Sequence, residues 1–126
     1  KEDMKEATIK IAGKEVKVAY CYATEILFSD YTGQEFSEFI KEAVVDKNTQ
    51  SSSKKVLYAI LSAIIAYSQS KNEDAVVVDN DIMFNAQPKE IIDAFTTIIS
   101  LYNDWYQLPK QIAKKAEKKK GAKGKN

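Results

Sequence analysis

Side-chain oxygens between residues 79 and 90 are spaced almost as in an EF-hand calcium loop. In a twelve-residue loop that starts at Asp79, position 5 is Met83, which has no side-chain oxygen. Position 6 is Phe84, where the loop needs Gly for its sharp turn. Pro88 also falls inside the frame. Helix capping explains Asp79 and Asp81 better, and we predict no metal site. The residues that the frame would use are Asp79, Asp81, Asn85 and Glu90.

The sequence lacks two side chains on which much enzyme chemistry depends. It has no His, the commonest general acid–base group near neutral pH, and all 19 of its basic residues are Lys, so it has no Arg. Its single cysteine, Cys21, can form neither an internal disulfide nor a cysteine-based zinc site. Without a His base, Cys21 is better explained as a small buried core residue than as a nucleophile. We predict no enzymatic activity and no cofactor, although carboxylate or lysine chemistry stays open.

Three acidic residues, Glu35, Glu38 and Glu42, are spaced so that they share one face of a helix. Such a face could hold two carboxylates for general acid–base catalysis. A helix face exposed to water has the same pattern, and the neighbouring Lys41 favours that interpretation. We predict that these carboxylates are solvated.

Aromatic side chains gather near the end of the last predicted helix, at Tyr102, Trp105 and Tyr106. Their spacing of three and four residues is typical of a helix stripe that faces a core. The same residue types also dominate the binding energy of protein interfaces. Both interpretations stay open, and we take these three residues as the leading candidates for partner binding.

Charge is divided unevenly along the chain. Residues 110–126 contain eight Lys and one Glu, a net charge of +7, whereas residues 1–109 contain 11 Lys and 17 acidic residues, a net charge of −6. We predict a single domain over residues 1–109 and a basic, disordered C-terminal tail over residues 110–126. Clustered Lys could bind phosphate weakly, but the tail lacks Arg and aromatic residues, and the acidic body would repel nucleic acid. A nucleic-acid partner is therefore disfavoured.

The elements that would position these residues follow from hydrophobic periodicity. Residues 7–20 alternate as in strands on either side of a turn at Gly13-Lys14, which predicts a β-hairpin with one covered face. Apolar residues then recur at helical spacing over residues 23–31, and Thr32-Gly33 supplies a helix stop. A second helix is predicted from Glu35 to about Asp46.

The second half of the sequence predicts a polar loop over residues 47–53, with Ser52 or Ser53 as N-cap of a helix over about residues 54–68. That helix is apolar almost all round, so it is either central in the fold or partly covered by a partner. A last helix is predicted from Pro88 to about Tyr106.

The stretch between these two helices is harder to assign. Val76 to Val78 could add a short third strand, and Asp79 could cap a single helical turn through Asn85. Together the elements predict an α+β fold: an N-terminal β-hairpin packed on a mainly helical domain of four to five helices.

No segment resembles a signal peptide or a membrane span. The longest apolar run covers residues 56–67 and is interrupted only by Ser62, which makes 12 residues against the roughly 20 that a spanning helix needs. The free thiol of Cys21 fits a reducing compartment. We therefore expect a soluble, cytoplasmic protein.

The order of motifs also matches a known family. A short hairpin with a Gly-Lys turn is followed by an aromatic-led segment from Tyr20 to Gly33 that ends in Asp-Tyr-Thr-Gly, and then by a helix centred on Phe39. Two long apolar helices complete the pattern. Over about residues 8–108, the chain resembles the tail assembly chaperones of long-tailed bacteriophages and prophages.

That resemblance implies a role in assembly in the cytoplasm of a bacterial host. Members of the family bind the tape measure protein, keep its long hydrophobic helices soluble, and are displaced as tail tube protein polymerises around it. They have no catalytic residues to transfer. A structural tail or connector subunit and a basic-tailed nucleic-acid-associated protein are the alternatives, and self-association stays open.

Overall fold

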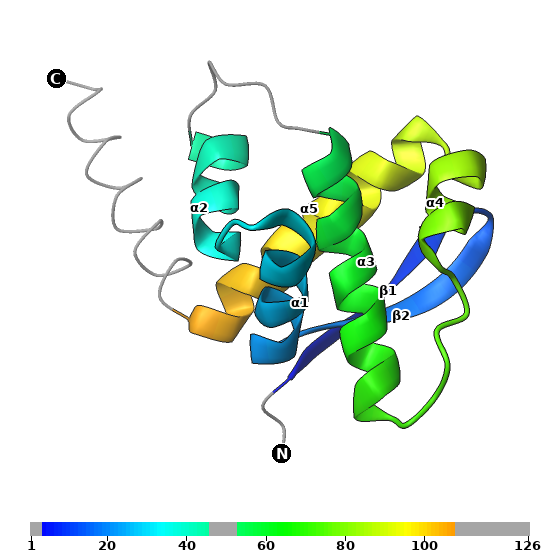
Figure 1. The fold of residues 1–126 in the computed structure, drawn as a ribbon, viewed down its shortest axis with the longest axis horizontal. Coiled ribbons are helices and arrows are strands. Elements are labelled where there is room, and N and C mark those ends of the chain that lie inside the picture. The colour runs from blue at the N-terminus through cyan, green and yellow to red at the C-terminus, as the bar shows by residue number, and fades with distance from the viewer. Residues whose placement is uncertain (1–3, 46–52, 108–126) are drawn as a thin grey trace, which may run out of the picture.

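The structure is a computed structural model that describes residues 4–45 and 53–107. A two-stranded antiparallel hairpin comes first and helices follow it, so the predicted α+β class is confirmed (Figure 1). The short helix α2 continues directly into one turn of π-helix, η1. The elements are β1 (Lys5–Ile11), β2 (Lys14–Tyr20), α1 (Tyr22–Thr32), α2 (Phe36–Ile40), η1 (Lys41–Val45), α3 (Ser53–Ser70), α4 (Asp79–Asn85) and α5 (Pro88–Tyr106).

The hairpin turns one residue earlier than the sequence predicts. Ala12 and Gly13 form the two-residue connection, with φ angles of 54° and 78°. Positive φ at both positions defines the type I′ turn, whose twist matches that of the strands beside it. Ile9 pairs with Val16 in the resulting register, and both side chains are buried on the covered face.

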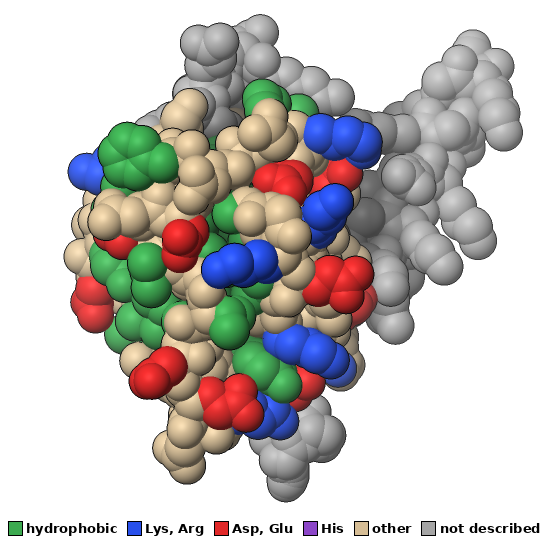
Figure 2. All heavy atoms as spheres, turned by 90° about the vertical axis from the view of Figure 1, so that its right-hand side faces the viewer, with side chains coloured by type: hydrophobic (Ala, Val, Ile, Leu, Met, Phe, Trp, Pro, Cys, Tyr) green, Lys and Arg blue, Asp and Glu red, His purple; other side chains and the backbone are tan. Residues whose placement is uncertain are grey.

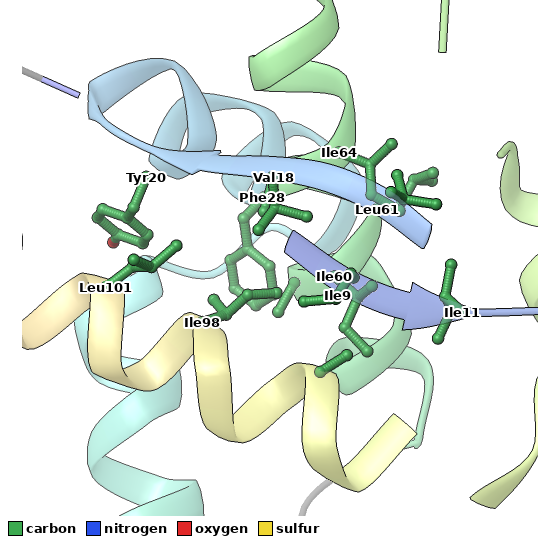
Figure 3. Close-up of a cluster of buried hydrophobic side chains, with 14 of the residues drawn as sticks. Ile9, Ile11, Val18, Tyr20, Phe28, Ile60, Leu61, Ile64, Ile98 and Leu101 are labelled. Carbon is green, nitrogen blue, oxygen red and sulfur yellow. The ribbon is translucent and has the colours of Figure 1, made fainter. Parts of the chain in front are cut away.

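The covered face of the hairpin lies against two long helices. Helix α5 packs on β1 and α3 packs on β2, while α1 packs on another side of α3. Side chains from all of these elements meet in one core, where Val18, Phe28 and Ile98 are fully buried (Figure 3). Helix α3 is therefore the central element, which explains most of its apolar composition without a partner.

Helix ends follow the predicted signals at two places. Gly33 ends α1 in the left-handed conformation, at φ 75°, where its missing Cβ avoids strain. Pro88 occupies the first turn of α5, and the Glu90 carboxylate accepts a hydrogen bond from the backbone N–H of Gln87 at 2.9 Å.

The third strand predicted at residues 76–78 is wrong. Among the residues that the structure describes, the sheet has two strands, and Val76 and Val77 form a bend that leads to Val78, the N-cap of α4. Val77 is fully buried and packs in the core, whereas Val76 and Val78 are exposed. Burial of the Val77 side chain accounts for the apolar character of this segment, so the segment need not pair as a strand.

Other predicted boundaries move by a few residues. Ser53 is the first residue of α3 rather than its cap, and α3 extends to Ser70. The second predicted helix begins at Phe36. Its predicted end at Asp46, most of the 47–53 loop, and the tail over residues 110–126 lie outside the described residues.

Candidate functional site

The acidic residues of the calcium-like frame take part in backbone hydrogen bonds. Asp81 accepts one from the N–H of Val78 at 2.9 Å, so it is Asp81, and not Asp79 as expected, that caps α4. Asp79 accepts a bond from the N–H of its neighbour Asn80 at 2.9 Å. Within residues 4–45 and 53–107, no three His, Cys, Asp or Glu side chains are grouped so that they could hold a metal ion.

Glu90 joins the start of α5 to the hairpin turn. Besides the N–H of Gln87, its carboxylate accepts bonds from the N–H groups of Ala12 and Gly13, each at 3.0 Å. Bonds from Gln87 and Gly13, which favour the charged form, lower the pKa of the Glu90 carboxyl. This contact links residues 77 and 78 positions apart in the sequence, and its role is structural.

Cys21 lies at the N-cap of α1 and is half-buried, not fully buried as expected. Its backbone N–H donates to the hydroxyl of Thr24 at 3.3 Å. The fully buried small residue at this junction is Thr24, whose hydroxyl donates to the carbonyl oxygen of Ala19 at 2.8 Å.

The carboxylates at residues 35, 38 and 42 lie along α2 and η1. Glu35 and Glu38 are exposed, and Glu42 accepts a hydrogen bond from the side-chain amide of Gln34 at 3.0 Å. The predicted solvated face is therefore confirmed for the first two.

The three aromatic residues near the end of α5 are half-buried. The Tyr102 ring packs edge-on against Tyr20 at 5.6 Å between centroids, and the Trp105 ring packs edge-on against Tyr22 at 5.3 Å. Much of their surface is thus used in packing the end of α5 on the hairpin and α1. A partner-binding role for Tyr102, Trp105 and Tyr106 stays a prediction.

Two tyrosine hydroxyls in this cluster share one acceptor. Tyr20 and Tyr106 donate to the same Glu25 carboxylate oxygen, at 2.8 and 2.5 Å. Burial, with the hydrogen bond to Glu25 as a further cause, raises the pKa of both hydroxyls. Both therefore stay protonated as donors and hold α1, β2 and α5 together.

A different surface, which periodicity did not point to, exposes more apolar side chains. Nine large hydrophobic residues of the described chain are exposed, and five of them lie between residues 72 and 93. Phe84 is 79% exposed and Ile92 is 64% exposed. We call this part of the molecule the 72–93 surface. Its five exposed apolar side chains are Val76, Val78, Met83, Phe84 and Ile92.

Two hollows adjoin α3, and two of these exposed residues, Met83 and Ile92, each line one of them. One has a volume of about 280 Å³ and lies between α3 and α4, with Leu57, Ile82 and Met83 in its lining. The other has a volume of about 480 Å³ and lies between α3 and α5, with Leu57 and Ile92 in its lining. Because Leu57 lines both, we call them together the α3 groove. Such apolar, open hollows suit the burial of another apolar surface.

Comparison with models of known families, with curated proteins and with solved structures gave no match. Among the described helices, none is both long and apolar enough to cross a membrane.

Proposed function

We propose that this chain is a phage tail assembly chaperone that binds a helical segment of the tape measure protein and keeps it soluble during tail assembly. The observation that carries the proposal is the α3 groove, an apolar depression bordered by exposed hydrophobic side chains on α4 and α5. The order of motifs described above supplies the identity of the partner.

An amphipathic helix is the shape of partner that this groove suits. Such a helix presents apolar side chains at three- and four-residue spacing, which can enter hollows on both sides of a ridge. Leu57 lines both hollows, Met83 lines the smaller one and Ile92 lines the larger one. Burying these side chains on a partner would remove exposed apolar area, at about 25 cal/mol per Å².

The second candidate surface is the end of α5 that carries Tyr102, Trp105 and Tyr106, which we call the aromatic end. The exposed apolar side chain that packs against it is Tyr22 of α1, which is 62% exposed. Ile26 on the same helix is 60% exposed. The rings of Tyr102 and Trp105 behind them already pack internally. The α3 groove is favoured because it combines exposed side chains with hollows that could receive a partner.

Co-expression with the tape measure protein from the same genome tests the proposal. We expect the wild-type chain to move the tape measure protein into the soluble fraction and to elute with it in a complex. The double variant Met83→Ser/Ile92→Ser should lose this effect, with affinity at least tenfold weaker, since each change removes an exposed apolar contact. The control Tyr22→Ser/Ile26→Ser changes equally exposed residues on α1 and should behave as wild type.

Two results would overturn the proposal. One is an unchanged solubility of the tape measure protein together with the absence of a complex. The other is assembly of the isolated chain into stable rings or tubes, which would favour a structural tail or connector subunit.

A further inference from the structure

The 72–93 surface is acidic as well as apolar. Residues 72–93 contain six acidic residues and one Lys, a net charge of −5, while residues 1–109 as a whole carry −6. Figure 2, a view of the side of the molecule on which α4 lies, shows hydrophobic and acidic side chains exposed together on the left, and lysines interspersed with further acidic side chains on the right. Most of the acidic excess of residues 1–109 therefore belongs to the segment that carries five of the nine exposed large hydrophobic side chains of the described residues.

Not all of these carboxylates are equally available to a partner. Glu90 is used by the hairpin turn, Asp81 caps α4, and Asp93 pairs with Lys89 at 2.8 Å. Glu73, Asp74 and Asp79 are exposed, and they flank the exposed side chains of Val76 and Val78 in the sequence. Asp79 also lines the smaller hollow of the α3 groove, together with Lys54.

We infer that the 72–93 surface binds a cationic amphipathic helix, with Lys or Arg on the flanks of its apolar face. Apolar contacts in the α3 groove would supply the affinity, and the exposed carboxylates would select the partner by charge and speed its approach. The same carboxylates disfavour a nucleic acid or an anionic membrane at this surface. The inference rests on the proposed function, because it names the chemistry of the segment that the groove receives.

Two synthetic helical peptides of identical apolar face, one with a Lys polar face and one with a Glu polar face, test the inference. Fluorescence anisotropy measures their affinity for the full chain at low and high salt. We expect the Lys peptide to bind at least tenfold more tightly, and the difference to shrink as salt screens the charges. Equal affinities, or tighter binding of the Glu peptide, would overturn the inference.

Variants of the chain test whether the peptides bind at the 72–93 surface. Asp74→Asn/Asp79→Asn should weaken the Lys peptide about fivefold, because each change removes an exposed carboxylate that could pair with a Lys of the peptide. Met83→Ser should weaken both peptides, since Met83 lines the α3 groove. The controls Glu35→Gln/Glu38→Gln and Ile26→Ser alter exposed side chains at α2 and on α1, and should leave the affinities unchanged. A loss of charge preference in the α2 control alone would place the binding elsewhere and refute the inference.

The outcome is separable from that of the proposed function. If the tape measure protein forms the complex but the Lys peptide shows no preference, the charge inference fails and the chaperone proposal stands. If the Lys peptide binds at this surface but no tape measure complex forms, the chaperone proposal fails and the charge inference stands. A stable dimer in sedimentation that buries the 72–93 surface would show a second copy as the occupant and would overturn the inference.

Discussion

Ala12 occupies a backbone conformation that suits other residues better. Its φ of 54° lies in the left-handed region, and it holds the first central position of a type I′ turn, where Asn before Gly is preferred. We predict that Ala12→Asn raises the free energy of unfolding by about 0.5–1 kcal/mol, since the left-handed region costs Ala more than Asn. Chemical denaturation measures this. Ala12→Val should lower stability, and a stability gain in both variants would contradict the explanation.

Glu90 makes folding stability depend on pH. The pKa of its carboxyl is lowered in the folded chain from an ordinary 4.5, so its contribution is full above that value and is lost as pH falls through the folded-state pKa. We predict that Glu90→Gln is less stable than wild type at pH 7, and that the difference shrinks as the pH falls below 4.5. Urea unfolding at several pH values measures it. A pH-independent loss of stability in Glu90→Gln would contradict the account.

Residue-scale contacts were the part that the sequence predicted least. The spacing of the acidic residues suggested capping by Asp79 and Asp81, which is confirmed for Asp81, whereas the bond that Gln87 donates to Glu90 was not predicted. Its bonds to Ala12 and Gly13 could not be inferred, because periodicity describes neighbours along one element and these residues are 77 and 78 positions away. The same limit hid the shared acceptor Glu25.

At the scale of elements, α3 tests how the core tolerates a polar group. Ser62 is fully buried, and its hydroxyl has no hydrogen-bond partner among the described residues. We predict that Ser62→Ala raises the free energy of unfolding by about 1 kcal/mol, because a buried polar group without a partner is destabilising.

The matched control lies six residues further along the same helix. Ser68 is also buried, but its hydroxyl donates to the carbonyl oxygen of Ile64 at 3.1 Å. Ser68→Ala has the same gain in helix propensity and loses a made hydrogen bond, so thermal denaturation should rank it below Ser62→Ala. The opposite ranking would show that the Ser62 hydroxyl is satisfied.

Helices and strands were predicted correctly where the length of the periodic segment agreed with the residues that mark its ends. The strands, α1 and α5 were predicted to within a few residues, because alternation, Gly33 and Pro88 all mark their ends. The strand at residues 76–78 was wrong because three β-branched residues favour a strand locally, while pairing depends on neighbours far away in the sequence. The π-helical turn of η1 has no signal in the sequence that we can name.

At the scale of the whole molecule, the proposed function depends on the apolar residues that are exposed outside the core. The apolar composition of α3 first suggested a partner, yet its central position between the hairpin, α1 and α5 explains most of it. What remains is the α3 groove and the 72–93 surface, which became visible only once α4 and α5 were placed beside α3. The sequence pointed instead to the aromatic end of α5, whose rings pack largely within the molecule.

Site-specific photocrosslinking in cells that co-express the tape measure protein tests the central claim most directly. A photoreactive benzoylphenylalanine replaces one exposed residue at a time: Met83 or Ile92 at the α3 groove, and Tyr22 or Ile26 on α1. The account predicts crosslinks to the tape measure protein from residues 83 and 92 and none from residues 22 and 26. Crosslinks from residues 22 and 26 alone, or from none of the four, would contradict it.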